Sequence, residues 1–91
     1  MMTKLSDALL HHIMEHYKDE LEDIEAYNAF SKKAEEDGDP MAAYVLDMIR
    51  HDEYTHAKAL RKMLWDHARH MMEDKPELEE KWRKAEATEN H

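Results

Sequence analysis

The sequence predicts an all-α protein, a long antiparallel helical hairpin followed by a short C-terminal helix. Three observations predict this fold. The single glycine lies in the stretch EEDGDPMA, the long segments on either side of it contain no helix-breaking residue, and both segments repeat apolar residues at alternating steps of three and four. We therefore expect one domain over residues 1–91, with helices at about 4–37, 40–73 and 76–87.

The turn between the two long helices is expected at Gly38. Glycine suits the position after a helix C-terminus, because it adopts the left-handed backbone conformation that often ends a helix. Asp39 is a favourable N-cap for the second helix, and Pro40 is a favourable first helical residue. Each long helix should then measure ~50 Å.

The short C-terminal helix is expected to begin at Pro76, because proline ends the preceding helix and is favourable in a first helical turn. Within it, Leu78 and Trp82 lie about one turn apart and form a small apolar patch. We expect this patch to dock on the hairpin or on a neighbouring chain. Residues 88–91 are expected to be frayed.

Composition and charge exclude several classes of function. The 22 acidic residues against 13 basic ones give a formal charge of −9, which disfavours nucleic acid or an anionic membrane surface as partners. The chain has no cysteine, which excludes disulfides, thiolate zinc sites and iron–sulfur clusters. It contains no signal-peptide pattern and no long apolar run, so we expect a cytoplasmic protein with no membrane partner.

Charged residues interrupt the apolar face of each long helix. The register of threes and fours places Glu20 at the centre of the apolar face of the first helix, and it places Glu53 and His56 on that of the second. Burying such groups without partners costs several kcal/mol, so we expect them to be compensated. In a hairpin that turns near residues 37–40, positions whose numbers sum to about 76 lie side by side. Glu20 should therefore lie opposite His56, with Glu53 one turn away.

A second copy of the chain would complete this group of side chains. Burying the apolar faces of two such helices takes four helices, so we expect a homodimer that forms a four-helix bundle. The dimer would supply two copies each of Glu20, Glu53 and His56, which is the ligand set of di-iron carboxylate bundles. Its four carboxylates would neutralise two divalent cations. The sequence thus predicts a site for two iron ions per dimer, although manganese and zinc use the same ligand types.

The stretches DELEDIEAY and IRHDEYTHAKAL resemble the paired helix motifs of the ferritin-like superfamily. The two-helix length, the Asp-Pro turn and the trailing helix are most similar to the encapsulated ferritins, and the resemblance covers most of residues 10–73. It implies a ferroxidase that oxidises Fe(II) to Fe(III) for iron storage or detoxification, with Glu20, Glu53 and His56 as its catalytic and metal-binding residues. It also implies rings of dimers and an encapsulin nanocompartment as a partner, and it leaves open whether this chain is encapsulated.

Five further residues are expected near the predicted site. Tyr27 and Asp52 are candidates to hold the second ring nitrogen of His56. Glu22, Asp23 and Glu25 flank Glu20 in the first helix and would form either an acidic entry path for cations or an ordinary solvated face.

Two alternative functions remain open from the sequence. A non-catalytic divalent-metal-binding or structural helical dimer would use the same residues without turnover. A rubrerythrin-like protein that reduces peroxide at a di-iron site would use a similar bundle, but that family usually adds a cysteine-bound iron centre. The cluster of His11, His12, Glu15 and His16 at helical spacing could capture a metal ion, but exposed histidines on an acidic helix are more often plain surface, so it is interpreted as a surface feature.

Overall fold

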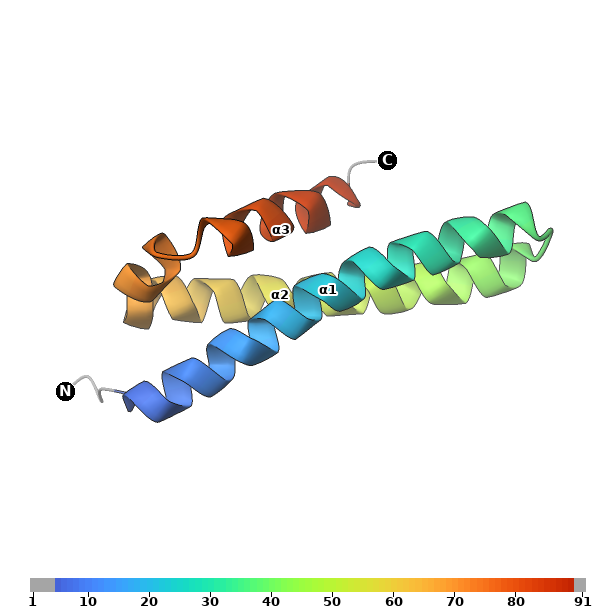
Figure 1. The fold of residues 1–91 in the computed structure, drawn as a ribbon. Coiled ribbons are helices and arrows are strands. Elements are labelled where there is room, and N and C mark those ends of the chain that lie inside the picture. The colour runs from blue at the N-terminus through green and yellow to red at the C-terminus, as the bar shows by residue number, and fades with distance from the viewer. Residues whose placement is uncertain (1–4, 90–91) are drawn as a thin grey trace.

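The computed structural model of the chain describes residues 5–89. Three helices, α1 (Asp7–Glu36), α2 (Pro40–Glu73) and α3 (Pro76–Ala87), form most of it, and this part of the chain contains no strand. α1 and α2 run antiparallel, and α3 returns along them (Figure 1). The predicted all-α class is confirmed for the single chain, and the four-helix bundle of a dimer stays a prediction.

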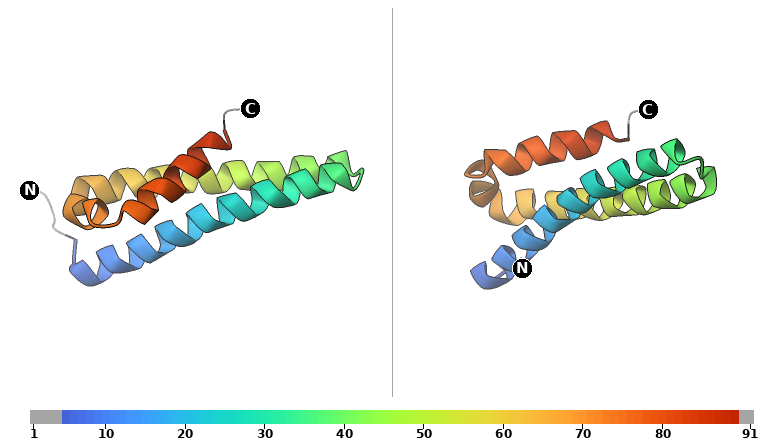
Figure 2. Two further views of the ribbon diagram at one scale, coloured as in Figure 1. Left: turned by 45° about the horizontal axis from the view of Figure 1, so that its top comes forward. Right: turned by 45° about the vertical axis from the view of Figure 1, so that its right-hand side comes forward.

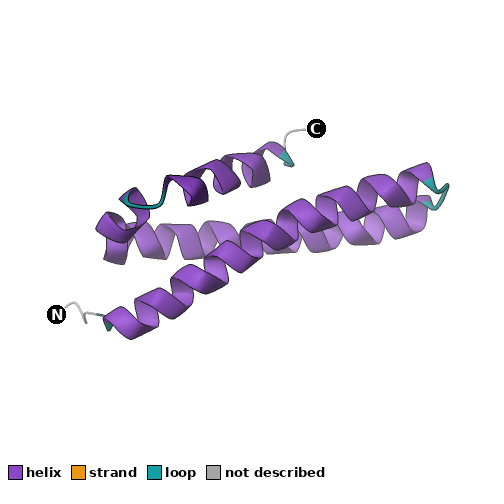
Figure 3. Cartoon of the chain, in the orientation of Figure 1, coloured by secondary structure: helices purple, strands orange, loops and turns teal. Residues whose placement is uncertain are grey.

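The helix ends follow local sequence signals. The side chain of Ser6 accepts a hydrogen bond of 3.2 Å from the backbone N–H of Leu9, which caps α1. The expected start at residue 4 lies outside the described residues. Gly38 has a φ of 82°, as a left-handed turn residue requires, and Asp39 caps α2 by accepting a hydrogen bond from Ala42. The turns between helices are short, as Figure 3 shows, and α2 and α3 have the expected bounds.

α3 closes one face of the hairpin. Its predicted apolar patch is buried, with Leu78 only 3% exposed and Trp82 only 7% exposed. The patch docks on the hairpin of its own chain, and Figure 2 shows α3 lying along α1 and α2 in both views. It packs into a core formed by apolar residues of both long helices, among them Met14, Tyr17, Leu21, Ile24, Ala57 and Leu64.

A kink inside α2 allows α3 to run back along the hairpin. Ala68 has non-helical backbone angles, a φ of −145° and a ψ of 42°, so the last turns of α2 take a new direction. Met72 is consequently buried in the core, and the chain can turn back at Pro76 to run along the hairpin.

The inward face of α2 differs from the predicted one. The most buried positions of its straight part recur at seven-residue intervals, namely Ala43, Arg50, Ala57 and Leu64. The predicted apolar register is instead half-buried or exposed at Leu46, Ile49, Glu53, His56, Leu60, Met63 and His67. The reason is that α3 adds a third helix to the packing, so the neighbouring stripe of small and apolar residues turns toward the core. The predicted register therefore borders the side of the hairpin that α3 leaves open, which we call the open face.

Arg50 fastens the end of α3 to α2. Its buried guanidinium donates hydrogen bonds to Asp47 at 2.8 Å, Thr88 at 2.9 Å and Glu89 at 3.1 Å. Nδ1 of His51 also lies 2.6 Å from a carboxylate oxygen of Glu89. The expectation of a frayed end is therefore wrong for Thr88 and Glu89, because they satisfy a buried cation. Its other part, residues 90–91, lies outside the described residues.

Candidate metal centre

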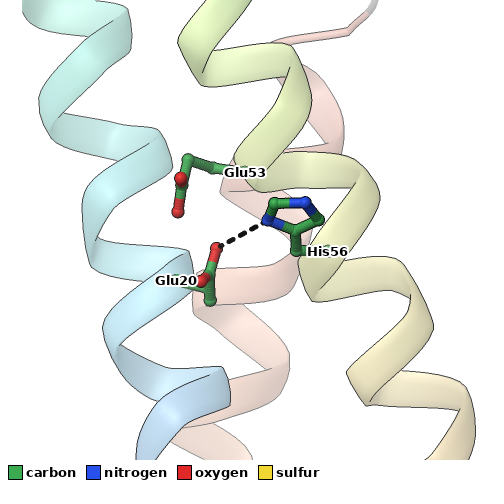
Figure 4. Close-up of side chains that lie close together, drawn as sticks. All are labelled: Glu20, Glu53 and His56. Carbon is green, nitrogen blue, oxygen red and sulfur yellow. Dashed lines mark ion pairs between the residues drawn. The ribbon is translucent and has the colours of Figure 1, made fainter.

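Glu20, Glu53 and His56 come together where α1 and α2 run side by side (Figure 4). Each offers one possible ligand atom, and these atoms all lie within 4.8 Å of one another. Nδ1 of His56 lies 3.9 Å from Oε2 of Glu20 across the hairpin. The structure thus brings together the three side chains that the sequence singles out.

Helical spacing explains the grouping on α2. Glu53 and His56 are three residues apart, so both side chains leave the helix on the same face. Glu20 reaches them from α1, while the α3 ribbon passes behind the hairpin (Figure 4). The site consequently lies on the open face, and the His56 side chain is 63% exposed.

Glu20 is in an unfavourable environment for a carboxylate. The residue is only 8% exposed, and its Oε2 is buried without a hydrogen-bond partner among residues 5–89. Burial, the neighbouring carboxylate of Glu53, and then Asp23 and Asp19 raise the pKa of Glu20 to about 8. Loss of hydration and nearby negative charge both disfavour the ionised form, so Glu20 retains its proton at neutral pH.

A divalent cation fits this arrangement. An unpaired buried oxygen is uncommon in folded proteins and calls for an explanation such as an ion. Here the oxygen lies beside a second carboxylate and an imidazole, and these are ligands that Fe(II), Mn(II) and Zn(II) accept. A cation would displace the proton of Glu20 and would offset the repulsion that ionisation of Glu20 beside Glu53 creates.

His16 belongs to the surroundings of the site, although the sequence interpretation treats it as surface. Its Nε2 lies 3.3 Å from Oε1 of Glu20, so Glu20 has an imidazole near each of its two oxygens. The signal available in the sequence is the spacing of four residues between His16 and Glu20, which places them on one helix face. The neighbouring His11 and His12 are exposed, and neither forms a hydrogen bond or ion pair within the described part of the chain.

The two candidates for support of the His56 ring do not reach it. Tyr27 packs edge-on against Phe30, with ring centroids 5.7 Å apart. Asp52 is exposed to solvent. Over residues 5–89, neither side chain forms a hydrogen bond with His56. The second ring nitrogen of His56 is therefore open to water or to a second copy of the chain.

The three acidic residues predicted for an entry path have different surroundings in the structure. Glu22 lies 3.7 Å from Lys81 of α3, and Glu25 is exposed without an ion pair among the described residues. Asp23 is closer to the centre in its electrostatics, because burial and then the charge of Glu53 raise its pKa. The sequence identifies the acidic segment, whereas the structure shows that Asp23 is the member affected by the charge of Glu53.

Comparison of the chain with protein families, curated proteins and solved structures gives no match. No helix within residues 5–89 has both the length and the apolar character needed to span a bilayer. The functional interpretation therefore relies on the geometry of the site and on the motifs that carry it.

Proposed function

We propose that the protein is a ferroxidase that oxidises Fe(II) to Fe(III) at a di-iron carboxylate site completed by two copies of the chain. The observation that carries this proposal is the group of Glu20, Glu53 and His56 around a buried, unpartnered carboxylate oxygen. Its residue types match the ligands of di-iron helical bundles, in which Glu-x-x-His on one helix faces a Glu on another. The resemblance of both helix motifs to the encapsulated ferritins supports the same activity.

Each chain would contribute half of the centre. Glu20 and His56 would hold one substrate ion from opposite helices, and Glu53 would bridge to the ion held by the second copy. The 63% exposure of the His56 side chain supports this arrangement, because that face is accessible to a partner. The open coordination positions would admit the oxidant.

The reaction balances with dioxygen as oxidant. Two Fe(II) substrate ions lose one electron each, and dioxygen takes up two electrons and two protons and leaves as hydrogen peroxide. Carboxylate ligands favour the products, because a hard, more highly charged ion gains more from anionic oxygen ligands. Glu20 would release its own proton on binding Fe(II), which turns a neutral group into an anionic ligand.

Apolar surface also supports association of two copies. Leu60 and Met63 are only partly buried beside the site, and further apolar side chains are exposed nearer the hairpin turn: Phe30, Met41, Tyr44, Val45 and Met48. Contact with a second hairpin would remove such surface from water. A hairpin cannot enclose a mineral, so storage would need a ring of dimers or a container. Under this proposal the protein works in the cytoplasm, either free or inside an encapsulin nanocompartment.

The test is oxidation of Fe(II) added without oxygen and then exposed to air, followed by near-ultraviolet absorbance. The unmodified protein should oxidise iron faster than buffer, whereas Glu53→Ala and His56→Ala should fall to the buffer rate with unchanged helix content. Glu25→Ala is the matched control, because Glu25 is exposed on α1, away from the ligand group.

Each outcome separates the functions considered. Oxidation by either ligand variant at the unmodified rate would show that the assigned site is wrong. Metal binding by the unmodified protein without faster oxidation would favour a passive metal-binding dimer. A rate enhancement with hydrogen peroxide and none with dioxygen would favour the rubrerythrin-like alternative.

A further inference from the structure

The two carboxylate oxygens of Glu20 face different histidine side chains. Oε2 faces Nδ1 of His56 at 3.9 Å, within the group that includes Glu53. Oε1 faces Nε2 of His16 at 3.3 Å, and His16 is outside that group. The His16 side chain is 66% exposed, so an imidazole reaches from the solvent to a buried carboxylate. Glu20 can therefore bind one cation through Oε2 and a second cation through Oε1.

A surface pocket lies beside Glu20 and is lined by both imidazoles, those of His16 and His56. Its volume is about 410 Å³, and it is lined by His16, Glu20, His56, Ala59, Leu60 and Met63. A water molecule takes up about 30 Å³ in the liquid, so the pocket holds an ion together with several waters. All of its ionisable lining residues are metal-ligand types, and no lysine or arginine lines it to repel a cation.

We propose that His16 is a further metal ligand, which with Oε1 of Glu20 holds a hydrated divalent cation in this pocket, in addition to the ion at Glu20, Glu53 and His56. Two ligands four residues apart on a helix can reach one ion, as in helical zinc motifs. An imidazole and a carboxylate suit Fe(II), Co(II) and Zn(II). The inference rests on the proposed metal centre, because Glu20 belongs to both positions.

The two positions differ in their affinity for a cation. The pocket offers two nearby protein ligands and open access to water, whereas the centre gathers three ligands around a buried oxygen. The cation at His16 therefore binds more weakly and exchanges faster with solvent. In the working protein this position receives incoming Fe(II) next to the oxidation site.

The test is calorimetric titration with Zn(II), which has no redox chemistry. The unmodified protein should show a tight and a weak class of binding. His16→Gln keeps a polar side chain near Glu20 but provides a poor ligand, and it should weaken the second class by about tenfold or more. His11→Gln is the matched control, because His11 is exposed on the same helix without contact to Glu20, and it should leave both classes unchanged.

A direct measurement identifies the ligand. Nitrogen resonances of the histidine rings, followed by NMR during the same titration, should show a shift at Nε2 of His16. In Glu53→Ala the tight class should be lost, and the shift at His16 should persist. A histidine that only forms an ion pair with Glu20 would lose its zinc-dependent shift together with the tight class in Glu53→Ala.

The outcomes are distinguishable. If His16→Gln binds zinc with the stoichiometry and affinity of the unmodified protein, the role of His16 is refuted and the proposed metal centre stands. If the unmodified protein binds no zinc, both proposals are refuted. Loss of fast iron oxidation with intact zinc binding at His16 would refute only the ferroxidase.

Discussion

The two faces of the hairpin differ in how completely their charged side chains are hydrogen-bonded. On the face that α3 covers, the Arg61 guanidinium donates two hydrogen bonds to Glu79, at 2.8 and 2.9 Å, and lies 4.9 Å from the ring centroid of Trp82. On the open face, the carboxylate of Glu20 lies beside that of Glu53, and Oε2 of Glu20 has no hydrogen-bond partner among residues 5–89.

The difference separates charges that support the fold from charges kept for another purpose. A buried ion that is paired and hydrogen-bonded is compatible with stability, whereas a buried carboxylate next to another one costs free energy. The buried Arg50 and the half-buried Arg61 both donate to acceptors, and the other buried side-chain atom without a partner among residues 5–89 is the neutral Nε1 of Trp65. The exception at Glu20 therefore indicates a site that is completed by a ligand.

The largest effect on stability is expected from the covered face. Trp82→Ala should lower the free energy of unfolding by about 3–5 kcal/mol, because a buried aromatic side chain is replaced by a cavity. Trp82 is 7% exposed and stacks on Tyr54 with ring centroids 5.3 Å apart. Urea denaturation measures the loss. Glu25→Ala, at an exposed residue without an ion pair among residues 5–89, is the control and should change stability by less than about 0.5 kcal/mol. Equal effects of the two changes would mean that α3 does not close this face.

The next largest effect on stability is expected from adding a divalent cation to the site on the open face. Zn(II) at about a hundred times its dissociation constant should stabilise the fold by about 2.7 kcal/mol. The gain should shrink as pH falls from 8 toward 5, because binding requires Glu20 to lose a proton that it holds with a pKa of about 8. Thermal unfolding with and without zinc across this range provides the measurement. A zinc effect that grows as pH falls would contradict the assigned ligands.

A smaller loss is expected from releasing the end of α3. Arg50→Met should lower the free energy of unfolding by about 2 kcal/mol, because hydrogen bonds from a charged donor to Thr88 and Glu89 are lost. Amide hydrogen exchange should speed up over residues 85–89. Lys58→Met, at an exposed residue of α2 without an ion pair in the described chain, should do neither. Unchanged exchange at the end of α3 would show that Arg50 does not hold it.

A change at the site itself should have the opposite sign. Glu20→Gln should stabilise the metal-free protein at pH 8, because an amide does not ionise beside Glu53. The pKa of Glu20 is raised from 4.5 to about 8 in the folded state, so its contribution to stability is present below pH 4.5 and is lost as pH rises through 8. The advantage of the variant should grow over that window. Denaturation at several pH values, with Glu25→Gln as control, would show a constant difference if the carboxylates do not interact.

The sequence predicts the hairpin and the level at which the site residues meet because both depend on local signals. Gly38, Asp39 and Pro40 determine the turn, and the turn determines which residues of α1 and α2 lie opposite each other. Glu20 and His56 follow from that register. Their grouping needs only helix geometry and the position of one turn.

The inward stripe of α2 could not be predicted in the same way. It depends on where α3 packs, which is a tertiary contact, and it contains Ala43, Ala57 and Arg50, which carry little hydrophobic signal. The sequence favours a surface role for His16 for a related reason, because an exposed histidine on an acidic helix looks like ordinary surface. The i, i+4 spacing to Glu20 becomes informative only once Glu20 is known to be buried.

The short turn at Gly38 also constrains how the length of this chain can vary. A residue inserted within a helix between the turn and the site would advance the helix by about 1.5 Å and rotate everything beyond it by about 100°. Such a change on the α2 side would carry Glu53 and His56 away from Glu20 while leaving the composition of the chain almost unchanged. An insertion or deletion between Glu20 and Glu53 should therefore disrupt the site more than most substitutions there, whereas a change of length outside these segments should leave it intact.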